Sequence, residues 1–304
     1  YVHVYPEVLS LSYQRRYFLE PAGDLLSEKF SQHNDRENLA FFTSRSIYNP
    51  AIFLPQALIA RWFWRKYDYP FIPIVILCRL AGVFVYVAGS YLAIRVIPVG
   101  KWVLVALALA PMALFQAATL NADGFTHAAS FLFIAFGIEF LLNPDQPRRT
   151  WKIWGFAATL IFLGMAKSGP MLLLPLLFFL PYRRFTSRAW GWIIFIATLL
   201  CFAIAAGWSA LSIPTSHYGQ SETTQNFGTQ LSLIFSTPID FLRAATSEYT
   251  SRFDMYYRNW LASYGHWVGA VPSIIFQLFP LVLGTAIFAE PRLPNFDRRK
   301  RLIL

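Results

Sequence analysis

Charge is scarce in this sequence. Only 14% of the 304 residues are Asp, Glu, Lys or Arg, whereas soluble domains carry roughly 25%. The chain therefore lacks the polar surface of a domain that faces water on all sides. Cysteine is scarcer still, and both copies, Cys78 and Cys201, fall inside apolar runs. This excludes a disulfide framework and a zinc site, and we interpret both as small buried apolar side chains.

Catalytic motifs of soluble enzymes are also missing. The sequence has no P-loop, HExxH, GxSxG or CxxC element, so nucleotide-binding, zinc-dependent and soluble hydrolase functions have no support. The net charge of +10 does not indicate a nucleic-acid partner, because the basic residues cluster in short segments between apolar runs. No run combines basic density with interleaved aromatic residues in the way that nucleic-acid-binding surfaces do.

Long hydrophobic runs dominate what is present. Hydrophobic residues make up 56% of the chain and the mean hydropathy is +0.43. The ten Trp and fifteen Tyr suit a membrane interface. A spanning helix needs about 20 apolar residues. The sequence therefore predicts an all-α, polytopic transmembrane bundle with external loops and about seven spanning or half-spanning helices, at 71–93, 102–120, 126–142, 153–166, 170–181, 190–213 and 270–289.

The fourth and fifth segments are short and are separated by Lys167, Ser168, Gly169 and Pro170. Gly and Pro together interrupt a helix. The segments on either side, 143–152 and 182–189, are both basic, and basic loops stay in the cytoplasm. The chain must therefore return to the side that it left, which favours a tight hairpin over the alternative of one kinked span.

The same rule orients the whole bundle. Segments 94–101, 143–152, 182–189 and 290–301 hold thirteen Lys and Arg against three Asp and Glu, and we place them in the cytoplasm. Outside lie 1–70, 121–125, the Lys167 turn and the loop 214–269; beyond residue 93 these hold four basic and five acidic residues.

The sequence divides into an external or interfacial segment, 1–70, and a transmembrane bundle, 71–304. Within the first, 51–64 predicts an amphipathic helix at the interface; a packed helix of a small external domain is the alternative. The chain begins without Met and ends in a basic cluster followed by Leu302-Ile303-Leu304, so we expect a fragment of a longer protein. Loop 214–269 is long enough to be functional, and its aromatic residues predict contact with the membrane surface.

Ionisable residues within or beside the spans are the candidates for chemistry, because a charge at the bilayer centre costs about 2.5–3.5 kcal/mol. Asp123 lies in the turn Asn121-Ala122-Asp123-Gly124. Its carboxylate either positions a hydroxyl, a metal or a cation at the mouth of an external cavity, or caps the N-terminus of the next helix. The two roles are compatible.

Arg79 and Lys167 are the candidate cations. Each either binds a lipid phosphate or forms an ion pair with a neighbouring helix, and for Arg79 the partner would be Asp123. Glu139 is interpreted as structural, either reaching the surface or pairing with Arg95. His266, in a run with Tyr264 and Trp267, is typical of an interface residue.

Three stretches carry a resemblance to a known family: Tyr48-Asn49-Pro50, the run from Gln116 through Asn121-Ala122-Asp123-Gly124, and Tyr264-Gly265-His266-Trp267 with Val271-Pro272. Over most of its length the chain resembles a bacterial family of predicted membrane proteins of unknown function that is grouped with the GT-C glycosyltransferases. The resemblance implies a GT-C-like bundle in the bacterial cytoplasmic (inner) membrane. It also implies transfer of a sugar from a polyprenyl-phosphate carrier to an envelope acceptor on the outer face.

In GT-C enzymes an acid in the first external loop normally acts as general base or metal ligand, and the resemblance implies the same role here. The resemblance offers Asp123 for this role; Glu7, Asp24 and Asp35 lie in the right region but outside a matching motif. Arg79, Lys167 and Arg258 would stabilise the departing phosphate, and Asn121 and His266 would complete the substrate site. The residues define no metal site and no cofactor, although a divalent metal is compatible with the family. The expected partners are membrane lipid and a lipid-linked sugar, without nucleic acid.

Two other functions use similar residues. A transporter or a flippase for lipid-linked saccharides would show paired broken helices in two repeats, whereas this chain shows one broken hairpin and no repeat. A non-catalytic component of envelope biosynthesis is the third interpretation.

Overall fold

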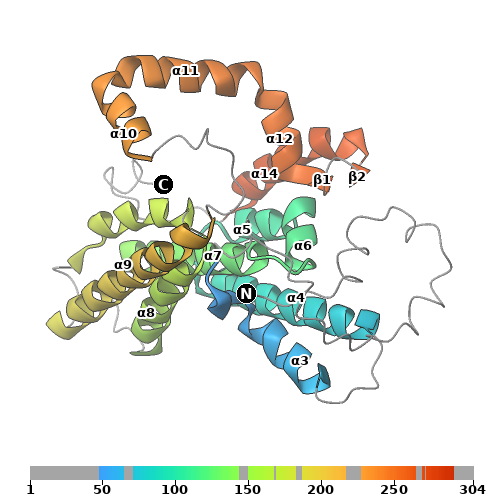
Figure 1. The fold of residues 1–304 in the computed structure, drawn as a ribbon, viewed down its shortest axis with the longest axis vertical. Coiled ribbons are helices and arrows are strands. Elements are labelled where there is room, and N and C mark those ends of the chain that lie inside the picture. Colours follow the sequence, from blue (N-terminus) through green and yellow to red (C-terminus); the bar gives the residue numbers. More distant parts are fainter. Residues whose placement is uncertain are drawn as a thin grey trace. The chain divides into compact units, whose positions relative to one another are not determined.

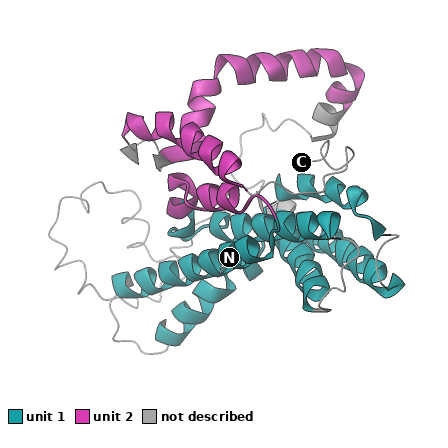
Figure 2. Ribbon diagram, turned by 180° about the vertical axis from the view of Figure 1, so that it is seen from behind, with its two compact units in different colours: residues 1–98, 116–216 teal, residues 99–115, 217–304 magenta. Residues whose placement is uncertain are grey.

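The computed structural model describes residues 48–64, 71–143, 150–167, 169–182, 187–216, 227–264, 269–270 and 272–290. The chain forms two compact units (Figure 2). Unit 1 comprises residues 1–98 and 116–216, and unit 2 comprises residues 99–115 and 217–304. Each unit is therefore built from two separate stretches of chain.

Unit 1 is built of packed helices (Figure 1), and aromatic side chains fill the interface between two of them. Helix α4 packs against α3 and α7, and α8 packs against α7 and α9. The rings of Phe133, Phe136, Phe140 and Phe156, all buried, join α7 to α8, with centroids 5.3–6.0 Å apart across that interface. The elements are η2 (Pro50–Phe53), α3 (Leu54–Trp64), α4 (Phe71–Val96), α7 (Asp123–Leu142), α8 (Thr150–Met165), η3 (Gly169–Phe179) and α9 (Arg188–Ser216).

Three helices in the described part of the chain are long and apolar enough to cross a membrane: Ile72–Val96, Asp123–Leu142 and Arg188–Ser212. Three shorter apolar helices accompany them, at Trp151–Met165, Gly169–Phe179 and Ser273–Ala289. The expected all-helical class with spanning helices is confirmed to this extent. The count of seven spans and the GT-C-like arrangement stay predictions.

The expected span 102–120 is two helices, α5 (Lys101–Ala108) and α6 (Pro111–Ala117), and the prediction of one continuous span is wrong. Pro111 is the reason, because the residue before a proline is driven away from the helical conformation. The end of α5 is marked by Leu109, with φ −93° and ψ 4°. Its beginning is marked by Gly100, whose positive φ of 78° is readily adopted only by glycine.

The other boundaries follow the sequence closely. Asn49 accepts a hydrogen bond at 2.9 Å from the backbone N–H of Ala51 and starts η2. The expected helix 51–64 corresponds to η2 and α3, and α3 packs against α4. The break at the Lys167 turn is present, and beyond it the chain continues as η3, which contacts α7 and α8. The hairpin's course through a membrane stays a prediction.

Unit 2 contains α5 and most of the segment that the sequence presents as the loop 214–269. That segment is largely helical: α10 (Phe227–Ser236), α11 (Pro238–Ser251) and α12 (Phe253–Ala262) follow one another. Strands β1 (Ser263–Tyr264) and β2 (Gly269–Ala270) pair antiparallel and lead to α14 (Ser273–Ala289). Helices α5 and α14 pack together, and the backbone N–H of Trp102 donates to Glu290 Oε1 at 2.7 Å.

Candidate functional site

An ion pair between Asp123 and Lys167 forms the centre of the candidate site. Asp123 is the first residue of α7, and Lys167 lies just beyond the end of α8. Both side chains are largely buried, with 20% and 30% exposed. The capping role considered for Asp123 is wrong, because Ala122 occupies the N-cap position. Its expected pairing with Arg79 is also wrong, since Lys167 is the partner.

The turn before α7 is fixed by local hydrogen bonds. Asn121 Oδ1 accepts the backbone N–H of Asp123 at 2.9 Å, and the Thr126 hydroxyl donates to the carbonyl of Ala122 at 2.7 Å. Gly124 allows the end of α6 to approach, because a Cβ added there would lie 2.9 Å from the Cα of Ala117. The carboxylate is therefore held on a rigid turn, as a reacting group requires.

Tyr48 covers the other side of the lysine. The Lys167 ammonium lies 4.8 Å from the centre of the Tyr48 ring, a cation–π distance. Burial alone would lower the pKa of Lys167, but the hydrogen bond and charge of Asp123, together with the hydrogen bond of Tyr48, outweigh burial and raise that pKa. Lys167 therefore keeps its positive charge throughout the physiological range.

His127 lies one helical turn after Asp123 and joins the site. Its Nε2 is 2.7 Å from Gln116 Oε1, and its ring stacks on Phe131 with centroids 6.3 Å apart. His127, Tyr48 and Gln116 were not among the site residues predicted from the sequence, although Tyr48 and Gln116 lie in the stretches that carry the family resemblance. The sequence did contain a signal for His127: it follows Asp123 by four residues, and residues four apart on a helix share a face.

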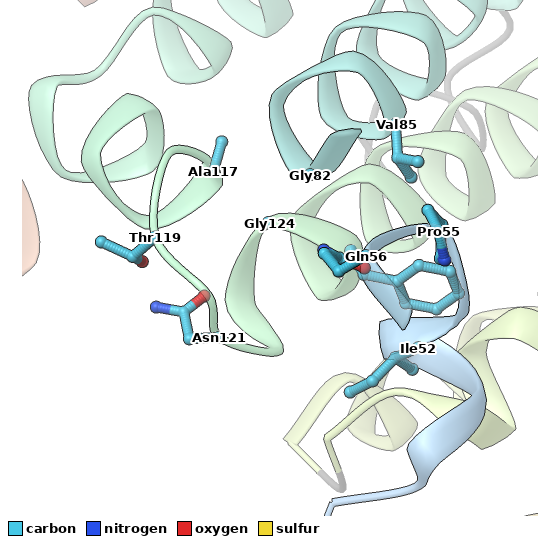
Figure 3. A pocket seen from close by; sticks show the side chains of 10 residues that line it. Ile52, Pro55, Gln56, Gly82, Val85, Ala117, Thr119, Asn121 and Gly124 are labelled. Carbon is cyan, nitrogen blue, oxygen red and sulfur yellow. The ribbon is translucent and has the colours of Figure 1, made fainter. Parts of the chain in front are cut away.

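A small pocket lies beside the turn and has about 250 Å³ of empty space, including its open mouth. Figure 3 shows side chains from three places meeting there: the η2–α3 segment, α4, and the turn that leads into α7. Its polar lining includes Gln56, Thr119 and Asn121. The Oε1 atom of Gln56 is buried and accepts no hydrogen bond from the described residues. A buried polar atom without a partner is costly, so a small ligand or water with a donor group fits here.

Of the remaining residues predicted for the site, two lie in the described part of the chain. Arg79, on α4, is exposed. Arg258, on α12 of unit 2, pairs with Asp254 at 2.7 Å and lies 5.2 Å from the ring centre of Phe276. The others, Glu7, Asp24, Asp35 and His266, lie outside the described residues.

Glu139 forms a second, structural ion pair. It is 8% exposed and binds Lys152, and it accepts a hydrogen bond at 2.9 Å from Asn143 Nδ2. The expected pairing with Arg95 is wrong: Arg95 donates to the Tyr91 hydroxyl at 3.5 Å instead. The physical reason is proximity: Lys152 lies at the start of α8, which packs against the end of α7, where Glu139 lies. The pair thus joins two helices rather than serving chemistry.

A metal site is not evident in these parts of the chain. Among the described residues, no group of three or more His, Cys, Asp and Glu side chains lies close enough to hold an ion. The acid at Asp123 is accompanied instead by a cation, an imidazole and amide groups. These side chains can bind an anionic group and accept a proton.

Comparisons with known proteins place the chain in a family. No curated protein and no solved structure matches it. The sequence model of a family of predicted membrane proteins, DUF2142, matches residues 25–304, which is most of the chain. This agrees with the spanning helices and with the resemblance to a family of predicted membrane proteins, whereas the grouping of that family with the GT-C glycosyltransferases stays a prediction. The chain therefore belongs to the DUF2142 family of predicted membrane proteins.

Proposed function

We propose that this protein is a membrane glycosyltransferase that moves a sugar from a polyprenyl-phosphate carrier to an envelope acceptor on the outer face of the membrane. The observation that carries the proposal is the meeting of Asp123 and Lys167 at one helix end, with His127 one turn away. Glycosyl transfer from a lipid phosphate needs a base near the acceptor and a cation near the leaving group.

In the proposed reaction, an acceptor hydroxyl oxygen forms a bond to the anomeric carbon while the bond from that carbon to the carrier phosphate breaks. The hydroxyl proton passes to the Asp123 carboxylate, and the electron pair leaves on the phosphate. Lys167 balances the phosphate charge. A phosphate that enters the ion pair takes Lys167 as its partner and leaves the Asp123 oxygens free for the proton.

The neighbouring side chains support these two roles. Gln116 fixes the His127 ring through the 2.7 Å contact, so the imidazole is positioned to hydrogen-bond a substrate group. Tyr48 limits the motion of the Lys167 ammonium. The amide groups of Gln56 and Asn121, at the pocket, are the kind of side chain that hydrogen-bonds sugar hydroxyls.

The charge distribution supports an outer-face site. The basic segments 94–101, 143–152, 182–189 and 290–301 would lie in the cytoplasm of a bacterial cell. The turn with Asp123 then lies on the opposite side, where nucleotide sugars are absent. A lipid-linked donor therefore suits this site, and the sequence has no nucleotide-binding motif.

The test uses the full-length protein in membrane vesicles with radiolabelled polyprenyl-phosphate sugars. Label leaving the lipid is measured for the wild type and for Asp123→Asn. The matched control is Asp240→Asn, which removes an exposed carboxylate paired with Arg243 at 3.3 Å in unit 2. We expect transfer in the wild type and the control, and loss of at least tenfold in Asp123→Asn, since a general base contributes about 10²–10⁴-fold.

Three results would contradict the proposal, the first for the role of Asp123 and the other two for glycosyl transfer itself. Equal transfer by the Asp123→Asn protein would remove Asp123 from the reaction and direct attention to an acid elsewhere, such as Glu7, Asp24 or Asp35. Movement of the intact lipid-linked sugar across the vesicle, with no label released from the lipid, would identify a flippase instead. Normal expression with neither transfer nor movement would favour a non-catalytic component of envelope biosynthesis.

A further inference from the structure

A continuous stripe of large side chains runs along α11 and α12 of unit 2. Its members recur at spacings of three and four, which places those of α11 on one face of that helix and those of α12 on one face of the next. The rings of Tyr249 and Tyr256 join the two sets, with centroids 5.2 Å apart. The members are Ile239, Leu242, Thr246, Tyr249, Phe253, Tyr256 and Trp260. We call this set the aromatic stripe. Six of the seven are large apolar or aromatic residues, and those six are between 37% and 71% exposed. A stripe of this size left uncovered by its own unit indicates a binding surface.

The charged residues of the same helices lie beside the stripe and pair with one another, and Glu248 also accepts a hydrogen bond at 3.1 Å from the hydroxyl of Tyr256 in the stripe. Asp240 pairs with Arg243 at 3.3 Å, Glu248 with Arg252 at 3.3 Å, and Asp254 with Arg258 at 2.7 Å. Each pair lies three or four residues apart on the helix, and each positive charge has its negative partner. These paired charges are therefore suited to water, and they leave no excess charge that would bind a charged macromolecule.

The stripe is continuous with the most apolar helix of unit 2. The Tyr257 hydroxyl donates at 2.7 Å to the carbonyl of Phe276 on α14, and the Trp260 ring meets Phe279 edge-on with centroids 5.6 Å apart. The exposed side chains of α14 are themselves apolar, among them Leu281 at 64% and Phe288 at 90%. At about 1.5 Å per residue, its 17 residues approach the thickness of a bilayer core, about 30 Å.

We infer that α11 and α12 lie on the surface of the lipid bilayer, with the aromatic stripe buried at the boundary between headgroups and acyl chains and with the paired charges in water. Three observations carry this. The chain belongs to a family of predicted membrane proteins, so a bilayer is adjacent. Tyr, Trp and Phe are the residues that membrane interfaces favour. The stripe ends in direct contact with an apolar helix of bilayer-like length.

A coiled coil with a second copy would use the same spacing, but it is a poorer fit. Coiled-coil seams are filled by branched aliphatic side chains that insert between their neighbours, whereas the stripe ends in Tyr249, Phe253, Tyr256 and Trp260. The inference does not depend on glycosyl transfer, so it stands or falls separately from the proposed function.

The test places single cysteines on the two faces of α11 in the full-length protein. Ile239→Cys and Leu242→Cys report on the stripe, and Asp240→Cys and Ala244→Cys, also at an exposed position, report on the other face. All four positions are exposed in the structure, so only the face distinguishes them. The native Cys78 and Cys201 are buried, and a parallel sample without added cysteine measures their background. Each cysteine carries a nitroxide label, in vesicles of phosphatidylethanolamine and phosphatidylglycerol.

Collision of each label with oxygen, which concentrates in lipid, is compared with collision with a water-soluble nickel complex. We expect the oxygen-to-nickel ratio to be several-fold higher at 239 and 242 than at 240 and 244. Equal ratios at all four positions would overturn the inference. Spin–spin broadening at 239 and 242 that vanishes on dilution with unlabelled protein would assign the stripe to a second copy instead. Labels at those positions shielded from both collision partners would assign it to another part of this chain.

Discussion

Asp123 at the start of α7 and Lys167 beyond the end of α8 form one ion pair although a helical hairpin separates them in sequence. Antiparallel packing of the two helices brings the beginning of the first to the end of the second. At the other end of the same hairpin, Glu139 and Lys152 form the equivalent link. The α7–α8 hairpin is therefore fixed by a charge pair at each end, and the first pair has an imidazole and a polar pocket beside it.

Reversing the first pair separates its structural role from its chemistry. Asp123→Asn leaves a largely buried ammonium without its carboxylate, and we expect a loss of about 1–3 kcal/mol in the free energy of unfolding. The double variant Asp123→Lys with Lys167→Asp keeps an ion pair in the reversed direction. Thermal unfolding in detergent should show part of the loss recovered, while transfer from a lipid-linked sugar should stay absent. Recovery of transfer would contradict the assignment of base and cation.

The raised pKa of Lys167 predicts how stability depends on pH. A lysine whose pKa is higher in the folded state than its usual 10.5 contributes stability that is fully present below 10.5 and is lost as pH rises through the folded-state pKa. The difference in Tm between the wild type and Lys167→Met should be constant from neutral pH to about pH 10 and shrink above it. Lys167→Arg is the control, because arginine stays charged there. A difference that shrinks near neutral pH would contradict the prediction.

The sequence was sufficient for the class of protein and for most helix positions. Spanning helices follow from run length, and the break at Lys167 follows from Gly169 and Pro170. The ion-pair partner of each charged residue was harder to predict, because an ion pair between helices depends on which helix ends lie together in the fold. Asp123 and Lys167 were both selected, yet the ion pair considered for Asp123 was with Arg79. The spacing of residues within one helix carries no information about which end of another helix lies beside it.

Other differences have equally local causes. Segment 102–120 is apolar throughout, and hydropathy alone cannot show that Pro111 starts a new helix there. Segment 214–269 has too few apolar residues to be a span and was treated as a loop, although the spacing of its aromatic stripe is helical. His127 was passed over because a single histidine carries no motif, and its contact with Gln116 depends on the turn between α6 and α7.

The Glu139–Lys152 pair is expected to matter for stability and not for transfer. Glu139→Gln keeps an acceptor for Asn143 but leaves Lys152 without a counter-charge on a largely buried side chain. We expect a loss of about 1–3 kcal/mol in the free energy of unfolding, with transfer per folded molecule unchanged. Asp254→Gln, at an exposed pair, should change stability by less than about 1 kcal/mol. Loss of transfer by well-folded Glu139→Gln protein would place this pair in the chemistry.

Helices α8 and α9 approach each other through a glycine. A Cβ added at Gly164 would lie 2.5 Å from the Cys201 carbonyl oxygen and 2.8 Å from its Cα, whereas a Cβ at Gly207 on α9 would meet nothing within 4 Å. Gly164→Ala must therefore separate the two backbones, and overpacking of this kind costs about 1–3 kcal/mol. Gly207→Ala should be neutral or stabilising. Equal Tm values for the two variants in detergent would show that α8 and α9 pack less closely than this.

The buried Oε1 atom of Gln56 distinguishes a ligand-binding pocket from a packing defect. Replacing a buried polar group that has no partner by an apolar group of similar shape is nearly neutral or stabilising, so Gln56→Met should leave Tm unchanged or raise it. If that oxygen accepts a hydrogen bond from a substrate hydroxyl, the same variant should raise the KM for the acceptor about tenfold, the loss of roughly 1.4 kcal/mol of binding.

Gly82→Ala is a second variant at the same pocket. Its Cβ would lie 3.1 Å from Gln56 Nε2 and 3.2 Å from the Ala117 carbonyl oxygen. It narrows the pocket while keeping the amide. A substrate that enters the pocket should lose affinity in both variants, whereas one that only approaches Asp123 should lose it in neither. Unchanged KM in Gln56→Met together with a higher Tm would mean that the amide oxygen serves no ligand, and the substrate would then be held by Lys167 and His127 outside this pocket.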